Sequence, residues 1–329
     1  RQLLDLRAAV ANRVAADLGW GVESSNVLIT NGGKQAVFSA FATLFDPGDE
    51  VLLPTPYWVT YPEAIQLTGA VTIEVPTSIE TGFKATPEVL DRFVSEKTKA
   101  LVFVSPSNPT GAVYTPDEVR AVGEWALERG IWVITDEIYD HLVYGDATFT
   151  SIVSAVPELQ DRTVILNGVA KTYAMTGWRV GWLVAPDDVA KAAINLQSHL
   201  ASNVANVSQK AALAAITGPQ EPVAEMRTAF DRRRKRMVAE LAAIPGVECL
   251  EPEGAFYAFP HLEGSLGRRI GDKTPTTTLE LADALLDVAQ VAIVPGEAFG
   301  APGYARLSYA LADDDLAEGV GRIAEALGG

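Results

Sequence analysis

The stretch TVILNGVAKTYAMTGWRVGWLVA, residues 163–185, determines the architecture of this 329-residue chain. It contains two short apolar runs, residues 163–166 and 180–184, with a polar, glycine-containing segment at residues 167–171 after the first. Short continuous runs of aliphatic residues are typical of strands that are buried on both faces. The stretch therefore predicts two core strands, with a polar loop that begins where the first strand ends.

Similar strand-like segments occur toward the N-terminus, where they alternate with helix-like segments. A short apolar run occupies residues 27–30, and further strand candidates occupy residues 51–53, 71–75, 100–104 and 132–135. Helix-like segments include residues 1–19, 34–45 and 117–128, the last with Thr115 as a cap and Pro116 at the first helical position. Aliphatic strands that alternate with helices are typical of a mostly parallel sheet covered on both faces. The sequence therefore predicts an α/β fold.

The pattern of predicted strands and helices changes after about residue 218. The pattern there predicts, in order, a charged helix at 222–243, a strand at 255–259, a Gly- and charge-rich loop at 262–275, a helix at 279–286, strands at 291–294 and 304–309, and a helix at 313–327. This mixture is typical of a smaller α+β domain. Because the length also favours about two domains, we expect a large domain at residues 1–228 and a small C-terminal domain at residues 229–329.

The chain has 26 basic and 42 acidic residues, which gives a formal net charge of −16. Binding to a nucleic-acid backbone depends on many Lys and Arg contacts, so this balance argues against a nucleic-acid partner. The basic run at residues 232–236 is interpreted as a solvated helix face. An acidic chain can still hold a small anion with a few cations in a pocket.

Two further features of the composition narrow the class of protein. The sequence has no stretch of 18 uninterrupted apolar residues, so it indicates no membrane span. The single cysteine, Cys249, excludes a disulfide framework and a Cys-rich zinc site, and it favours a reducing, cytoplasmic location. His141, His199 and His261 show no metal-ligand spacing, so we expect no metal site.

Polar clusters follow four of the predicted strands. They occupy residues 31–34, 105–108, 136–139 and 167–171. In open α/β sheets, ligands bind outside the C-terminal ends of the strands, so we expect the four clusters to converge at one edge. The sequence therefore predicts a functional site at that edge.

The first two candidates are an anion-binding turn and a carboxylate. Gly33 and Lys34 lie at a predicted helix start, where backbone amides suit a phosphate or carboxylate, although many α/β proteins have such a turn for structural reasons. Asp136 follows an apolar strand, where a desolvated carboxylate needs a cationic partner such as a protonated heterocyclic nitrogen. A helix cap or a structural salt bridge is the alternative role for Asp136.

The other candidates are cations. Lys171 lies between apolar strands, which is unusual for a lysine. Desolvation and a second cation, Arg179, would lower its pKa and make the amine nucleophilic, as Schiff-base chemistry requires. The alternative for Lys171 is a surface lysine in a hairpin loop. Arg306 lies in an alternating strand, where it either forms a salt bridge or grips a carboxylate bidentately.

Four motifs carry a resemblance to a known family. They are SPSNPTG at 105–111, TDEIYDHLVY at 135–144, NGVAKTYAMTGWRVGW at 167–182 and ARLSYA at 305–310. In order and spacing they resemble the class I, fold-type I aminotransferases that use pyridoxal 5′-phosphate, over residues 26–326. Within that family the chain is most similar to prokaryotic aspartate aminotransferases that carry GGKQA, here residues 32–36.

The resemblance implies a role for each candidate toward the coenzyme. Lys171 would bond to the coenzyme aldehyde and later move the proton, and Asp136 would keep the pyridine nitrogen protonated. Tyr139 and Asn108 would hydrogen-bond the phenolic oxygen of the ring. Trp58 would stack on the ring and border the substrate, although a tryptophan is more often a core or interface residue. The phosphate of the coenzyme would be held by Arg179 and by the backbone amides of Gly33 and Lys34.

The resemblance also implies substrates. Arg306, helped by Asn108, would bind the substrate α-carboxylate, and Lys34 would contact the distal carboxylate of a dicarboxylic substrate. A cation at the pocket mouth favours aspartate, glutamate and their 2-oxo acids over neutral acids. The alternative is that Lys34 points to solvent. Prephenate, which also carries two carboxylates, is a further candidate substrate.

The chain differs from the family pattern at two points, and the resemblance also implies a second subunit and a cis peptide bond. Gly168 stands where many relatives have a serine that contacts phosphate. Relatives also carry an N-terminal arm before the point that matches Arg1, and this segment is absent from the sequence. The family forms homodimers with a shared active site, so a homodimer is expected. The Asn108–Pro109 bond is expected to be cis, as it is in relatives.

Two rival functions remain open at this point. One is a different reaction of the same coenzyme, or an aminotransferase with aromatic or neutral substrates. The other is a non-enzymatic, aminotransferase-like domain of a transcription regulator. The acidic balance and the lack of a visible basic DNA-binding helix disfavour the second rival.

Overall fold

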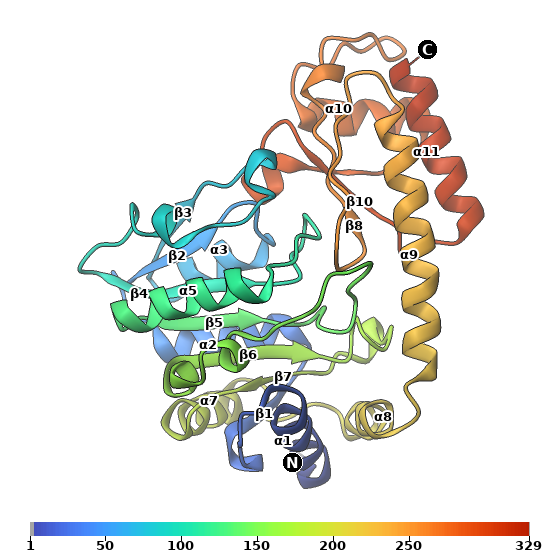
Figure 1. Ribbon diagram of the computed structural model, residues 1–329. Helices are drawn as coiled ribbons and strands as arrows, with labels where there is room; N and C mark the ends of the chain where they lie inside the picture. The colour runs from blue at the N-terminus through green and yellow to red at the C-terminus, as the bar shows by residue number, and fades with distance from the viewer. Residues whose placement is uncertain (1–2, 329) are drawn as a thin grey trace.

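Seven strands form the main sheet in the computed structural model, which describes residues 3–328 (Figure 1). In spatial order they are β1 (Val27–Thr30), β7 (Gly181–Val184), β6 (Thr163–Gly168), β5 (Trp132–Asp136), β4 (Thr98–Val104), β2 (Glu50–Pro54) and β3 (Val71–Val75). β7 runs antiparallel to both neighbours, and the other neighbouring pairs are parallel. The predicted mostly parallel sheet is confirmed, and β4, β5 and β6 end at one edge.

Helices cover both faces of this sheet, because side chains along a strand point alternately to each face. In β4, Leu101 and Phe103 belong to one apolar cluster, and Ala100 and Val102 belong to the other. The first cluster includes side chains from α1 (Leu4–Leu18), α4 (Pro87–Leu90), α5 (Pro116–Arg129), α6 (Ile152–Ala155) and α8 (Asn206–Thr217). The second includes side chains from α2 (Gly33–Leu44), α3 (Thr60–Leu67) and α7 (Asp187–Leu200).

A smaller antiparallel sheet follows in the sequence. Its order is β8 (Tyr257–Ala258), β10 (Ala305–Ser308) and β9 (Val294–Pro295). It shares an apolar cluster with α9 (Glu221–Ala242), α10 (Thr278–Ala284) and α11 (Asp313–Gly328). In Figure 1, α9 rises from beside α8 to the level of the small sheet. A domain boundary between residues 228 and 229 would therefore lie inside α9.

Predicted strands in the smaller sheet are too long. The strand expected at 255–259 is reduced to Tyr257–Ala258, because Ala255 takes a left-handed φ of 59° that breaks the extended run. The strand expected at 291–294 begins only at its last residue, Val294. There the preceding helix continues through a π-helical turn at Leu285–Ala289 and ends at Gln290, so the next residues lead out of the helix.

The basic run at residues 232–236 is not wholly a solvated face. Arg234 is only 3% exposed, and its guanidinium donates to Asp231 Oδ1 at 2.6 Å and to the Pro252 carbonyl at 2.8 Å. The sequence interpretation is wrong for Arg234, because this position on α9 turns toward the loop that precedes β8. A buried arginine requires such partners.

The two parts meet where that loop crosses the segment after β4. The amides of Glu253 and Gly254 both donate to the Gly111 carbonyl, at 3.0 and 2.9 Å. A β-carbon on Gly254 would lie 2.5 Å from Pro106 Cβ, so only glycine lets the backbones come this close. This contact places residues 105–111, which carry Asn108, against the smaller part. As expected, the Asn108–Pro109 bond is cis.

Residues 3–328 contain neither a membrane-spanning helix nor a metal-binding cluster of side chains. No helix in this range has both the length and the apolar character that crossing a membrane requires. No group of three or more His, Cys, Asp or Glu side chains in the same range is arranged to hold a metal ion.

Candidate active site

One cavity, of about 320 Å³, lies where the ends of β4, β5 and β6 face the smaller sheet. Its lining comes from both parts of the molecule. All of the site residues predicted from the sequence line it, namely Gly33, Lys34, Trp58, Asn108, Asp136, Tyr139, Lys171, Arg179 and Arg306. The structure therefore brings the predicted set together, while the role of each residue stays a prediction.

Asp136 is the last residue of β5 and is buried. Its Oδ2 accepts a hydrogen bond from Tyr61 Oη at 2.7 Å, and its Oδ1 accepts one from the Ile138 amide at 3.1 Å. Burial raises the pKa of Asp136, although these two hydrogen bonds and the nearby Lys171 oppose that shift. A buried carboxylate in this state gains from a cationic ligand.

Lys171 follows β6 and is partly buried, with its Nζ 5.1 Å from the centre of the Phe256 ring. Burial lowers the pKa of Lys171, and the nearby cations Arg306 and Arg179 lower it further, against the opposing charge of Asp136. The amine thus has the desolvated, cation-rich surroundings that favour its neutral, nucleophilic form.

The turn before α2 is built around a glycine. Gly32 has a φ of 81°, and a β-carbon there would collide with the guanidinium of Arg179. Arg179 takes a φ of 56° and donates to the Thr176 carbonyl at 2.9 Å. No side chain caps the start of α2. The guanidinium therefore lies against a helix N-terminus, an arrangement that suits an anion such as phosphate.

Gly168 has a structural explanation. It pairs with Gly181 across β6 and β7, and a β-carbon on Gly168 would lie 2.9 Å from the Gly181 Cα atom. A β-carbon on Gly181 would in turn lie 2.7 Å from the Gly32 carbonyl carbon. The serine that many relatives of the expected family carry at this point does not fit so close an approach.

Arg306 extends from β10 on the opposite side of the cavity. Its Nη1 donates to Asn108 Oδ1 at 2.9 Å. Its Cζ lies 4.4 Å from the centre of the Tyr257 ring and 5.0 Å from that of Phe299. Within residues 3–328 it forms no ion pair, so the salt-bridge alternative is wrong for the described chain. The guanidinium is therefore free of any carboxylate partner from this part of the chain.

Lys34 is exposed and lines the same cavity at the first turn of α2. Its Nζ lies 5.5 Å from the centre of the Trp58 ring, within the range of a cation–π contact. This contact holds the ammonium group over the aromatic wall of the cavity. Lys34 thus borders the cavity and is open to solvent, and its contact with a distal carboxylate stays a prediction.

Three aromatic residues at the site were not predicted from the sequence: Tyr61 and Tyr257, which line the cavity, and Phe256, which contacts Lys171. Tyr61 lies three positions after Trp58 at the start of α3, and the two rings meet edge to face at 5.4 Å. That spacing is a signal that could have found it. Phe256 and Tyr257 lie in a short segment of the smaller part, where no local pattern connects them to Lys171 or Arg306.

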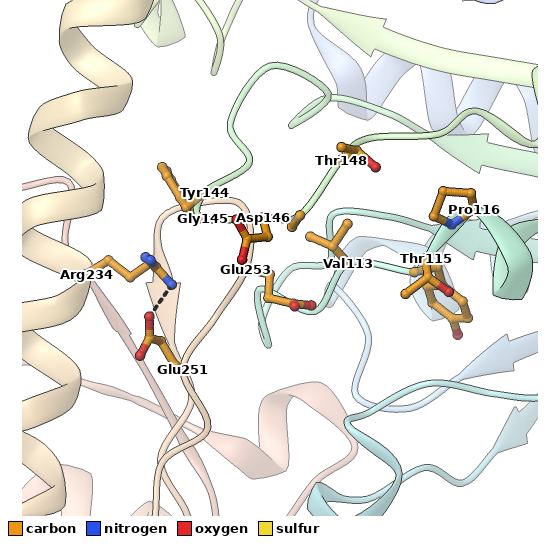
Figure 2. Close-up of a pocket in the computed structure, with 12 residues that line it drawn as sticks. Val113, Thr115, Pro116, Tyr144, Gly145, Asp146, Thr148, Arg234, Glu251 and Glu253 are labelled. Atoms are coloured by element: carbon orange, nitrogen blue, oxygen red, sulfur yellow. Dashed lines mark ion pairs between the residues drawn. The ribbon is translucent and has the colours of Figure 1, made fainter.

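A larger cavity, of about 460 Å³, lies elsewhere between the two parts (Figure 2). Arg234 of α9 and Glu251 border it and form an ion pair, with Nη1 and Oε1 2.7 Å apart. Val113 and Thr115, near the start of α5, border it from the large part. None of the predicted site residues lines this cavity. Its greater size therefore does not make it the candidate site.

Comparisons with known proteins identify the family. The family profile described as "Aminotransferase class I and II" matches residues 1–323. An aspartate aminotransferase of Streptomyces avermitilis is 59% identical over 325 residues, which cover 99% of this chain and 80% of that protein. A probable aspartate/prephenate aminotransferase of Aquifex aeolicus is 45% identical over 98% of this chain and 81% of that protein.

Solved structures agree with these sequence matches. The crystal structure of the aspartate aminotransferase from Rhizobium meliloti superposes with a TM-score of 0.95 at 36% identity. The match covers 99% of this chain and 82% of that one. The similarity therefore extends over both parts of the molecule.

Proposed function

The chain belongs to the class I and II aminotransferase family, and on that premise we propose that it transfers the amino group between aspartate or glutamate and 2-oxo acids, with pyridoxal 5′-phosphate as coenzyme. It is an enzyme of the aspartate transaminase type. One observation carries the proposal. Lys171, with a lowered pKa, and the buried Asp136 lie in one cavity, close enough for each charge to affect the other.

The donor set of the cavity fits this coenzyme. The buried Asp136 needs a cation, and a protonated pyridine nitrogen is one. The guanidinium of Arg179 and the uncapped start of α2, at Gly33, suit its phosphate. The ring of Trp58 offers a flat apolar wall. When bound, the coenzyme supplies an aldehyde for an amine and an aromatic ring that accepts electrons.

The chain's own residues would then divide the work. The lowered pKa of Lys171 favours the neutral form of its amine, which would take and return the proton at the substrate Cα atom. Asp136, held by Tyr61, would pair with the protonated pyridine nitrogen, a cation that offsets the burial raising the pKa of this carboxyl group. Tyr139 and Asn108 face the cavity with groups that can hydrogen-bond the phenolic oxygen of the ring.

Two cations at separate points favour a dicarboxylic substrate. Arg306, oriented by Asn108, would bind the α-carboxylate as a planar fork. Lys34, over Trp58, would bind the second carboxylate. Prephenate has two carboxylates as well, and some relatives are named for activity on it. The family resemblance further supports a homodimer with a shared site and a cytoplasmic location.

The half-reaction with aspartate tests the proposal. Purified protein loaded with pyridoxal phosphate and mixed with aspartate alone should yield one equivalent of oxaloacetate while the coenzyme changes to its pyridoxamine form. Lys171→Ala should lower the rate at least about a hundredfold, because a positioned proton-transfer group contributes that much or more. Turnover by Lys171→Ala at the wild-type rate, or no conversion by the wild-type protein, would refute the proposal.

The specificity of the site depends on Lys34. Lys34→Gln should lower kcat/KM for aspartate and glutamate roughly tenfold, as expected for loss of one partly solvated charge contact, and should change the values for alanine and phenylalanine less than about twofold. Lys191→Gln, on the exposed surface of α7, is the matched control. A uniform loss across all substrates would count against this role. Activity of the wild type on prephenate decides whether it is a second substrate.

A further inference from the structure

Tyr257 contacts both sides of the candidate site. It belongs to β8 of the smaller part, is buried and lines the cavity. Its Oη lies 3.0 Å from the Oη of Tyr139, which follows β5 of the large part. Its ring centre lies 4.4 Å from the Cζ of Arg306. One side chain thus touches both a predicted coenzyme ligand and a predicted substrate ligand.

The hydroxyl pair leaves one proton available for a ligand. Burial raises the pKa of both Tyr139 and Tyr257, so both phenols keep their protons. A hydrogen bond between two phenols uses one of the two O–H groups. When Tyr257 donates to Tyr139, the O–H group of Tyr139 remains free to donate to an acceptor in the cavity. Such a chain of hydrogen bonds also polarises and strengthens its last donor.

The ring has a separate function. The guanidinium of Arg306 contacts two aromatic rings, those of Tyr257 and Phe299, and donates to Asn108. Stacking on an aromatic face restricts the rotation of the planar fork, which otherwise has many rotamers. Because a carboxylate must approach in the plane of the fork, a fixed plane lowers the entropy cost of binding.

We propose that Tyr257 is a positioning residue with two separable functions. Its ring holds the Arg306 guanidinium in the plane that receives the substrate carboxylate, and its hydroxyl orients Tyr139 to donate to the phenolic oxygen of the coenzyme. The inference rests on the proposed function and deepens it. Because Tyr257 and Tyr139 belong to different parts of the molecule, the function of the hydroxyl depends on the docking of the smaller part onto the large one, whereas the ring and Arg306 both belong to the smaller sheet.

Two variants separate the functions. Tyr257→Phe removes the hydroxyl and keeps the ring, and Tyr257→Leu removes both. Tyr309→Phe is the matched control, because it also removes a buried hydroxyl from the smaller part. The Tyr309 hydroxyl donates to the Ala255 carbonyl, and Tyr309 does not line the cavity. Each protein is loaded with pyridoxal phosphate. The measurements are the pH at which the coenzyme absorbance titrates and the Kd of succinate, a dicarboxylate without an amino group.

The two variants should differ in one measurement and agree in the other. Both should shift the absorbance titration upward by about half a pH unit, because a weakened donor stabilises the coenzyme phenolate less. The Kd of succinate should rise roughly 3- to 30-fold in Tyr257→Leu and less than about twofold in Tyr257→Phe. The control should match the wild type in both measurements.

The inference is overturned if Tyr257→Phe leaves the titration where it is in the wild type, or if Tyr257→Leu binds succinate as tightly as Tyr257→Phe does. Neither result depends on turnover. A protein that binds coenzyme and succinate but fails the aspartate half-reaction refutes the proposed function alone. A protein that completes the half-reaction while the Tyr257 variants match the wild type in both measurements refutes this inference alone.

Discussion

Glu137 is a second buried carboxylate directly beside Asp136. Its Oε1 accepts hydrogen bonds from Ser151 Oγ at 2.6 Å and Thr135 Oγ1 at 3.3 Å, and the side chain is 2% exposed. Burial raises the pKa of Glu137 to about 8, the nearby charge of Asp140 adds to the shift, and the hydroxyl donors partly oppose it. At neutral pH this residue is therefore largely a neutral acid, unlike an ordinary surface glutamate.

Glu137 makes the stability of the protein depend on pH. In the unfolded chain a glutamate loses its proton near pH 4.5, and in the folded protein this one keeps it up to about pH 8. The folded state binds more protons between these values, so the contribution of Glu137 to the free energy of unfolding falls as pH rises through that window. Glu137→Gln should abolish this part of the fall and should be more stable than the wild type at pH 8.

Urea unfolding at pH 5, 6.5 and 8 measures the effect. Glu124→Gln, at an exposed position on α5, is the control that should keep the wild-type dependence. Equal pH slopes for the wild type and Glu137→Gln would contradict the assignment.

At this scale, the sequence revealed residues whose chemistry is unusual for their surroundings. Lys171 between apolar strands and Asp136 at the end of one can each be recognised from their immediate neighbours. Tyr257 could not, because its importance comes from contacts with Tyr139 and Arg306, and both are remote in sequence. Arg234 was misread for the same reason, since its partner Pro252 lies on a different element.

At the scale of elements, the crossing of the loop before β8 over the segment after β4 leaves no space for a side chain. Gly254→Ala would place its β-carbon 2.5 Å from Pro106 Cβ. Gly254 does not have a positive φ, so the destabilisation would come from this steric clash and not from backbone strain. We expect a loss of about 1–3 kcal/mol in the free energy of unfolding, typical of overpacking. Dicarboxylate binding should also weaken, because the Arg306–Asn108 hydrogen bond spans the same junction.

A second alanine variant separates this clash from the general effect of replacing glycine. Gly319 lies within α11, and a β-carbon there would meet no atom within 4 Å. Gly319→Ala should therefore stabilise the protein by about 0.5–1 kcal/mol, the usual gain at a helix position with room for the methyl group. Urea unfolding measures both variants. A Gly254→Ala protein as stable as the wild type would show that the junction gives way at little cost.

Most strands of the large sheet could be predicted because they are buried on both faces and form continuous apolar runs; the edge strand β3, which is partly exposed, was recognised from its β-branched residues. β3, predicted at residues 71–75, has those bounds in the structure. The strands of the smaller sheet are only two to four residues long, so no such run develops. Their limits follow from local backbone geometry, such as the left-handed Ala255, which the sequence pattern did not indicate.

At the scale of the whole molecule, charge is distributed unevenly. The chain has a net charge of −16, yet the charged residues that line the candidate site are four cations and one carboxylate: Lys34, Lys171, Arg179, Arg306 and Asp136. Cations gathered in a partly desolvated cavity repel one another. An anion that binds there relieves this repulsion and stabilises the folded state.

Inorganic phosphate should therefore raise the Tm of the protein without coenzyme by more than chloride does at the same ionic strength, and pyridoxal phosphate should raise it further. A ligand at a hundred times its Kd adds about 2.7 kcal/mol to the free energy of unfolding. Differential scanning fluorimetry measures the shifts. Arg179→Gln should reduce the difference between phosphate and chloride, and an identical difference in that variant would place the anion elsewhere.

The cavity draws its lining from residues between Gly33 and Arg306, and this has a consequence for biosynthesis. A ribosome makes the chain from its N-terminus, so the amine at Lys171 is translated long before the carboxylate fork at Arg306 or the ring of Tyr257. A chain halted between these points has Lys171 but lacks Arg306, whose charge helps to lower the pKa of the lysine. The surroundings that activate the lysine and the fork that would bind the α-carboxylate are therefore completed together, once the smaller part has been made.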